Sequence, residues 1–196
     1  MKTRKRLSFL KIVLLLVITA GMIWAFQMQY ERFHSEDYPV KAVIIQQVNT
    51  SSGGPVIATY RWHRAKHWLI LYTVEQDDKF LFKAIDHKRL DAPVEELMAD
   101  KKSNGVWVKI EGKWRYFNEN LQEEERDGQN RDPKSNESFP FTINREENIV
   151  EIQMNDNDTL HFPITEHEEL QALYPMSGDR TVWLGVYDDD LKIITK

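Results

Sequence analysis

Residues 7–26 read LSFLKIVLLLVITAGMIWAF, and this apolar run decides how the rest of the chain is placed. Its last part, Ile12–Phe26, carries no charge. Twenty residues of α-helix measure about 30 Å, which is the thickness of the hydrocarbon core of a bilayer. Lys11 lies one turn inside the run and can extend its ammonium group back to the interface. We therefore predict a transmembrane anchor over residues 7–28.

The residues on the N-terminal side of this run set its orientation. Four basic residues and no acidic one precede it, namely Lys2, Arg4, Lys5 and Arg6. Basic flanks stay on the cytoplasmic side, so residues 1–6 are predicted to be a cytoplasmic tail and the rest extracytoplasmic. The alternative is a secretory signal peptide, cleaved after Ala20 or Ala25, which would leave a secreted protein. The length of the run favours retention in the cell membrane as a single-pass protein.

Charge is distributed unevenly along the chain. Residues 1–26 contribute +5, whereas the remaining 170 residues contribute −10, with 21 basic against 31 acidic side chains. An acidic body repels the phosphate backbone, so nucleic acid is excluded as a partner. The body contains no run of basic residues, and we expect no polybasic patch that draws it onto anionic lipid.

The chain contains no cysteine. This excludes disulfides, zinc held by cysteine, thiol catalysis and the acylated cysteine of a bacterial lipoprotein. Extracellular animal domains of this size often carry disulfides, so their absence favours a bacterial cell envelope.

Beyond a polar stalk at residues 29–39, the body at residues 40–196 is dominated by short β-branched and aromatic runs separated by turn residues. Two stretches are predicted to be helical, Leu90–Lys101 after the cap Asp91 and residues 165–174 after a capping box. The expected fold is α+β: a mainly antiparallel β ectodomain with two short helices. Strands are expected at residues 40–48, 56–62, 67–75, 80–86, 106–110, 113–117, 139–144, 149–154, 159–164, 181–187 and 191–195.

An acidic segment at residues 118–138 interrupts this pattern and is predicted to be a linker or surface loop. It separates two halves, residues 40–117 and 139–196, that share a hairpin–helix–hairpin order. The tripeptides Val106-Trp107-Val108 and Val182-Trp183-Leu184 recur, as do Glu95-Glu96-Leu97 and Glu168-Glu169-Leu170. Two ββαββ units related by duplication would explain this recurrence, although chance matches of tripeptides would explain it as well.

No metal site, cofactor site or catalytic residue is predicted. His63 and His67 are four residues apart, but the segment between them is expected to be a turn, with Arg64 and Lys66 opposing a cation. The acidic clusters at residues 156–158 and 188–190 lie where hairpin turns are expected, and they lack the pattern of an EF-hand.

Five tryptophans lie on predicted strands and form the single candidate binding platform: Trp62, Trp68, Trp107, Trp114 and Trp183. If they are exposed in a row, they would bind glycan or a protein partner. Core packing is nevertheless favoured over such a platform, above all for Trp107 and Trp183, which alternate with polar or small residues.

The sequence therefore favours a membrane-anchored, non-catalytic envelope protein whose acidic body binds a membrane or wall protein. The first alternative is a module that binds cell-wall glycan or peptide through exposed tryptophans. The second is an envelope hydrolase, which would need two carboxylates, or a histidine and a carboxylate, converging in a pocket.

Overall fold

The structure is a computed structural model of the whole chain. It describes residues 2–35, 37–46, 54–76, 80–127, 138–155, 158–165, 169–176 and 180–195. The chain forms two compact units, Met1–Asp37 and Tyr38–Lys196. We call the second unit the body.

The first unit consists of one long helix, α1 (Lys2–Ser35). Its segment Lys11–Tyr30 is long and apolar enough to cross a membrane, and every side chain in that segment is exposed. The predicted N-terminal apolar helix is thus confirmed, in a form that suits either an anchor or a signal sequence. The helix also continues through residues 29–35, which were expected to begin a stalk.

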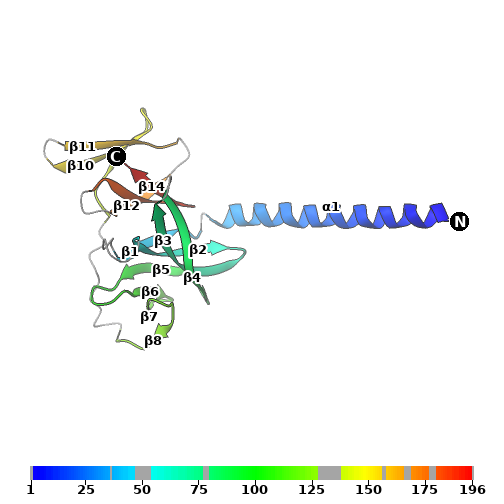
Figure 1. Cartoon of the computed structure of the whole chain (residues 1–196), viewed down its shortest axis with the longest axis horizontal. Helices are drawn as coiled ribbons and strands as arrows, with labels where there is room; N and C mark the ends of the chain where they lie inside the picture. Colours follow the sequence, from blue (N-terminus) through cyan, green and yellow to red (C-terminus); the bar gives the residue numbers. More distant parts are fainter. Residues whose placement is uncertain are drawn as a thin grey trace. The chain divides into compact units, whose positions relative to one another are not determined.

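The body consists of antiparallel strands arranged in four sheets (Figure 1). The sheets have the strand orders β1-β2-β3-β4, β5-β6-β7-β8, β12-β13-β14 and β11-β10-β9. The predicted mainly antiparallel β architecture is confirmed. The bounds are β1 (Lys41–Gln46), β2 (Val56–His63), β3 (Lys66–Gln76), β4 (Phe80–Leu90), β5 (Val94–Ala99), β6 (Val106–Ile110), β7 (Lys113–Phe117), β8 (Glu123–Glu124), β9 (Thr142–Asn144), β10 (Ile149–Asn155), β11 (Asp158–Pro163), β12 (Leu170–Pro175), β13 (Val182–Tyr187) and β14 (Leu191–Thr195).

The sheet β1–β4 is central because both of its faces are covered. Val43 and Ile45 of β1 pack in a core with β5–β7, while the alternate residues Ala42 and Ile44 pack in a second core with β12–β14. Successive side chains of a strand point to opposite faces, so a strand covered on both faces needs an unbroken apolar run. This explains the sequence AVII at residues 42–45.

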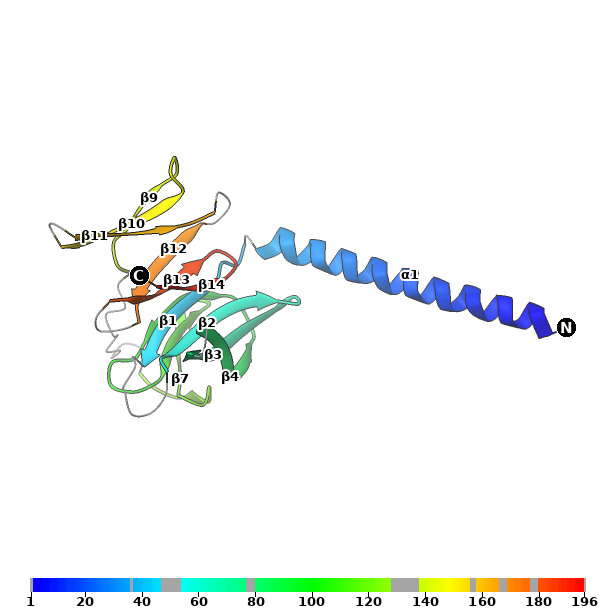
Figure 2. The same cartoon turned by 45° about the horizontal axis from the view of Figure 1, so that its top comes forward.

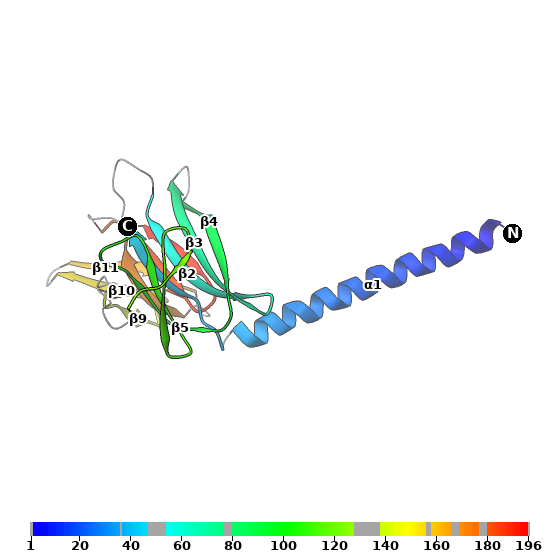
Figure 3. The ribbon, with the colours of Figure 1, turned by 90° about the horizontal axis from the view of Figure 1, so that it is seen from below.

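The remaining sheets stack outward from this centre. Figure 2 shows β9–β11 and β12–β14 as successive layers next to β1–β4. The outermost pair of layers shares a third core that contains Val150, Leu173 and Trp183. On the other side of the centre, β5 lies beside β1 and β2, and Figure 3 shows it in front of that sheet when the molecule is seen from below.

The helix predicted at Leu90–Lys101 is wrong, because this stretch contains the strand β5. Val94 pairs with Ile110 and Glu96 pairs with Lys109, so Glu95 is an extra, bulged residue. The bulge shifts the pleat by one residue and places Val94 and Leu97 in the same core despite their spacing of three. A bulged strand therefore imitates the apolar spacing of a helix.

The helix predicted at residues 165–174 from a capping box is also wrong, because this stretch contains the strand β12. Residues 166–168 lie outside the described residues, and β12 begins at Leu170. Leu170 pairs with Tyr187 and Ala172 pairs with Val186, which leaves Gln171 as the bulged residue. Leu170 and Leu173, again three apart, share one core.

Because strands occupy both stretches in the part of the chain that the structure describes, the ββαββ units are not confirmed. What recurs is a bulged strand followed by a strand with a buried tryptophan, Trp107 in β6 and Trp183 in β13. The bulged residues Glu95 and Gln171 lie 76 positions apart, and so do the two tryptophans. The two strand pairs β5-β6 and β12-β13 cover opposite faces of the central sheet.

The segment predicted to be a linker, residues 118–138, is described as far as residue 127. Its one large apolar side chain, Leu121, is buried in the core between β1–β4 and β5–β7. Asn118 accepts hydrogen bonds from the main-chain N–H groups of Asn120 and Gln122. Residues 128–137 lie outside the described residues.

Thr59 provides a test of the second core. It is fully buried in β2, and among the described residues no hydrogen-bond partner is found for its Oγ1 atom. A buried hydroxyl without a partner costs about 1–3 kcal/mol. We expect Thr59→Val, which replaces the hydroxyl by a methyl of similar size, to raise the free energy of unfolding by about 1 kcal/mol.

The measurement is urea unfolding of the full chain in detergent micelles, followed by near-ultraviolet circular dichroism. Thr59→Ser is the control, because it keeps the hydroxyl and loses a buried methyl, and it should lower the free energy of unfolding by about 1 kcal/mol. If both variants are destabilised, the hydroxyl is hydrogen-bonded in solution.

Candidate binding surface

Two of the five tryptophans in the predicted platform are buried. Trp107 is 3% exposed, and its Nε1 donates a hydrogen bond of 3.0 Å to the buried carboxylate of Asp100. Trp183 is 0% exposed, and its Nε1 donates to the carbonyl oxygen of Arg180 at 2.9 Å. Side chains in these positions hold the sheets together and cannot touch an external ligand.

The other three tryptophans, Trp62, Trp68 and Trp114, are half-buried and do not form one row. Trp62 pairs with His67 across the β2–β3 hairpin, and Trp68 pairs with Arg61, so their side chains lie on opposite faces. Trp114 lies on β7 in another sheet, where it pairs with Lys109. The structure therefore does not bring the predicted platform together.

The histidines and acidic clusters do not form a metal site among the described residues, where no group of three ligands comes together. His63 and His67 flank a hairpin turn rather than sharing a helix face. Asp190 forms an ion pair with Arg61, and residues 156–157 lie outside the described part.

One pair of carboxyl groups lies in contact, Asp188 with Glu169. Burial raises the pKa of Asp188, and its hydrogen bond and repulsion with Glu169 raise it further. The Asp188 carbonyl accepts a hydrogen bond of 2.9 Å from the N–H of Val40, at the start of the central sheet. This pair sits where β13 meets the central sheet, and we assign it a structural role.

The turn between β2 and β3 holds two non-glycine residues in a strained conformation. Arg64 and Ala65 have φ values of 51° and 56°, and they close a two-residue hairpin between His63 and Lys66. Such a turn normally carries Asn-Gly or a similar pair, because the left-handed region costs other residues about 1 kcal/mol. Strain of this kind is found at functional sites.

The ring of His67 ties this hairpin to the beginning of the body. A hydrogen bond of 2.8 Å joins Tyr60 Oη to His67 Nδ1, and the ring of Tyr38 lies edge-on to that of His67 with centroids 5.1 Å apart. Tyr38 also stacks on Trp62 at 5.8 Å. Burial raises the pKa of Tyr60 to about 12 and lowers the pKa of His67.

Strand pairing gathers basic side chains at this same end of the central sheet. We define the basic hairpin end as Arg64, Lys66, Lys88 and Arg89. Arg89 pairs with Trp68, and Lys88 pairs with Leu69, so β4 returns beside the turn that carries Arg64 and Lys66. All four side chains are exposed. Sequence analysis predicted no basic patch, because two of these residues lie more than twenty positions from the other two.

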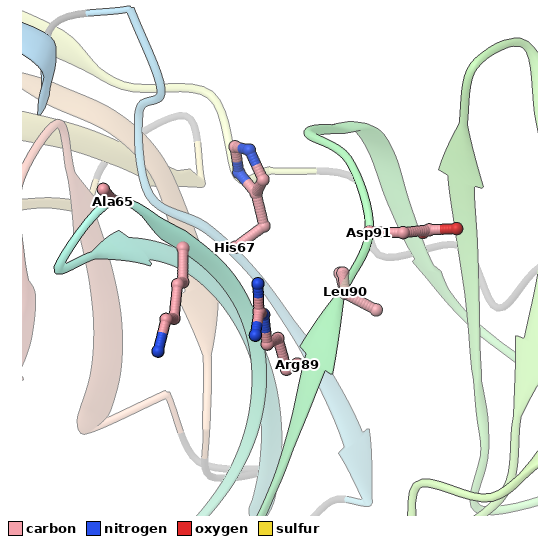
Figure 4. A pocket seen from close by; sticks show the side chains of 6 residues that line it. Ala65, His67, Arg89, Leu90 and Asp91 are labelled. Atoms are coloured by element: carbon pink, nitrogen blue, oxygen red, sulfur yellow. The ribbon is translucent and has the colours of Figure 1, made fainter.

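An open depression of about 440 Å³ lies at the basic hairpin end (Figure 4). It is lined by Ala65, Lys66, His67, Arg89, Leu90 and Asp91. The single acid, Asp91, accepts two hydrogen bonds of 3.0 Å from the guanidinium of Arg115, which lowers its pKa. Its charge is thereby compensated, and the depression remains positive.

The second candidate surface is the outer edge of β4, an 11-residue strand at the end of the central sheet. Leu81 is 60% exposed and Ile85 is 55% exposed. Within the described part of the body, they are the only large apolar side chains with such exposure. We call this surface, Phe80–Leu90, the β4 edge.

The strain in the β2–β3 turn can be tested by substitution, and the β6–β7 turn of the same body serves as the comparison. Ala65→Gly should raise the free energy of unfolding by about 1 kcal/mol, because glycine adopts positive φ at no steric cost. The β6–β7 turn already has this arrangement, with Glu111 at 49° and Gly112 at 73°. Gly112→Ala should therefore lower the free energy of unfolding by a similar amount. Urea unfolding of both variants checks this, and a destabilised Ala65→Gly would contradict it.

His67 should make stability depend on pH. Because its pKa is lowered in the folded state, the unfolded chain binds a proton first as the pH falls. The contribution of His67 is fully present above about pH 6.5 and is lost as the pH falls through its folded pKa. Between pH 8 and pH 5 the parent chain should thus lose more stability than His67→Gln. An equal loss in both proteins would exclude this role.

Comparison of the sequence with models of known protein families finds no match, and comparison with curated proteins finds none either. No family is therefore assigned to the chain. Function has to be inferred from the side chains of the body, from its open strand edge and from the helix that precedes it.

Proposed function

We propose that the chain is a membrane-anchored, non-catalytic protein of the cell envelope, whose body binds a membrane or wall protein. The partner contributes an extended segment that pairs with the β4 edge. The observation that carries this proposal is a long terminal strand that also bears the exposed side chains Leu81 and Ile85. Extended peptides commonly bind by adding a strand to such an edge.

The apolar helix supports the anchoring part of the proposal. In the segment Lys11–Tyr30 the side chains are exposed and almost entirely apolar, which water does not favour and lipid does. The basic residues before it favour a cytoplasmic N-terminus and an extracytoplasmic body. Cleavage as a signal peptide remains the alternative, and it would leave the β4 edge unchanged.

The chemistry of the β4 edge defines the kind of segment that fits it. Besides its two exposed apolar residues, the strand carries Lys83, His87, Lys88 and Arg89 against the single acid Asp86. An added strand with alternating apolar and acidic side chains would complement this surface.

The bulge of β4 limits how much of the edge such a segment can use. Leu71 pairs with Asp86 and Tyr72 pairs with Ala84, so Ile85 is the bulged residue. The edge is therefore divided into two runs, residues 80–84 and 86–90. We expect the partner to pair with one run of about five residues, since bulges interrupt the regular hydrogen-bond ladder.

The two alternative functions have less support. A glycan platform needs aromatic rings in one row, and Trp62 and Trp68 lie on opposite faces while Trp107 and Trp183 are buried. A hydrolase needs a general acid and base that face a substrate, and the contacting pair Asp188 and Glu169 lies at a junction of sheets. In the depression, Asp91 is held by the guanidinium of Arg115 and His67 Nδ1 is hydrogen-bonded to Tyr60 Oη, so neither group is directed at a substrate.

The test is photo-crosslinking of the full chain in its native membrane. A photoreactive amino acid at position 81 or 85 should give one dominant adduct, which mass spectrometry identifies, while the same amino acid at position 159 should not. Thr159 is an exposed residue on β11, which is also an edge strand. The mass of the membrane-bound chain shows at the same time whether residues 1–30 are retained.

A pair of matched variants separates binding from folding. Leu81→Lys with Ile85→Lys should abolish the adduct and change the free energy of unfolding by less than about 0.5 kcal/mol, because both side chains are exposed. Thr159→Lys with His161→Lys should leave the adduct unchanged. Equal adducts from β4 and β11, or none from β4, would overturn the proposal.

A further inference from the structure

The basic hairpin end differs in sign from the chain after residue 26 taken as a whole, whose formal charge is −10. Arg64 and Lys66 lie at one end of the β2–β3 hairpin, and Lys88 and Arg89 follow on β4 with their side chains on opposite faces, Arg89 on the face of Trp68. Among the described residues, no ion-pair partner is found for Lys66, Lys88 or Arg89. Asp91, the acid in the adjoining depression, is held by Arg115. This end of the body therefore attracts anions.

An aromatic residue, Trp68, lies next to the basic side chains of this end of the body. Trp68 pairs with Arg61 on one side and with Arg89 on the other, so a tryptophan lies between two arginines across three strands. Its Nε1 donates a hydrogen bond of 3.3 Å to the carbonyl oxygen of His63. Mixed tryptophan and arginine surfaces are typical of the boundary between lipid headgroups and water.

The chain length limits how far this end can be from the membrane. Tyr30 is the last residue of the segment that could span the bilayer, and Tyr38 packs on Trp62 and His67 of the hairpin. The helix continues to Ser35 at about 1.5 Å per residue, and three further residues span at most about 10 Å. Tyr38 is thus within about 20 Å of the end of the apolar segment. Headgroups occupy roughly 5–8 Å of that distance.

We infer that the basic hairpin end binds the anionic phospholipid headgroups of the membrane that holds α1. This inference rests on the proposed anchoring, and it requires the partner to pair with the run 80–84 of the β4 edge, because Arg89 lies in the run 86–90. Arg89 and Lys66 contact lipid phosphates, with the open depression between them accommodating a headgroup. The acidic remainder of the body is repelled by the same surface, so the attraction also orients the body.

The expected effect of charge removal on membrane binding follows from the number of charges removed. Each basic residue near an anionic membrane surface favours the bound state by about fivefold. Removing the charges of Lys66 and Arg89 should therefore lower the ratio of membrane-bound to water-exposed hairpin by about 25-fold. Added salt should also weaken the binding of the basic hairpin end to anionic lipid, because it screens the charges.

The experiment uses the full chain reconstituted in vesicles. Because the sequence has no cysteine, Ala65→Cys places a single nitroxide label at the turn, and its accessibility to oxygen and to a water-soluble nickel complex reports its depth. We expect an interfacial depth in vesicles that contain phosphatidylglycerol and a water-exposed label in purely zwitterionic vesicles. A label at Thr159→Cys should be water-exposed in both.

Charge variants identify the residues responsible. Lys66→Gln with Arg89→Gln should return the label at position 65 to water in the anionic vesicles. Lys101→Gln with Lys102→Gln, an equal loss of charge at exposed positions on another loop, should not. Equal exposure of the label in both lipids would overturn the inference. So would an interfacial depth in both lipids that survives the loss of Lys66 and Arg89.

Two further outcomes distinguish other anions and a failure of the anchor. Displacement of the label by an acidic peptide, but not by added phosphatidylglycerol vesicles, would show that the surface binds protein and would overturn the lipid assignment. If the chain does not remain in the vesicles, the proposed anchoring has failed, and with it the inference. The crosslinks from positions 81 and 85 test the partner separately.

Discussion

The burial of both faces of the sheet β1–β4 is the constraint on which the rest of the body depends. Val43 and Ile45 need β5–β7 to cover them, and Ala42 and Ile44 need β12–β14. Neither flanking sheet can be lost without exposing one apolar face of the central sheet. The chain meets this requirement with two similar strand pairs, β5-β6 and β12-β13, each with a bulge at its start. Each of these pairs turns a tryptophan away from the central sheet.

Much of the strand content could be predicted from the sequence. The runs at residues 106–110, 113–117 and 191–195 match β6, β7 and β14, because β-branched and aromatic residues alternate there between clear turns. The two predicted helices are wrong, and the cause lies in the local strand geometry. A bulge changes the apolar spacing from two to three, and in β5 and β12 the extra residue falls where a helix would have placed a polar face. The candidate cap Asp91 strengthened the wrong assignment of the first helix.

The candidate surfaces were harder to predict, because they depend on pairing between distant strands. Lys66 and Arg89 are brought together by the register of β3 and β4, which no local pattern reveals. The terminal position of β4, which carries the exposed Leu81, follows from the sheet order, and sheet order is a property of the whole fold. The tryptophans show that residue type and strand assignment alone do not predict which side chains form a binding surface. Five lie in strands, yet their faces and burial separate them into core residues and scattered surface residues.

The bulge at Ile85 has a consequence for copies of the chain that share a membrane. Proteins held in a plane with one orientation meet at a far higher effective concentration than they do in solution. A flat edge strand with exposed apolar residues would then join copies edge to edge into ribbons. The bulge prevents two β4 strands from pairing over their full length, and the lysines at positions 83 and 88 add repulsion between copies. Under the proposed anchoring, the same edge can therefore remain open to a different chain while copies of the protein stay dispersed in the plane of the membrane.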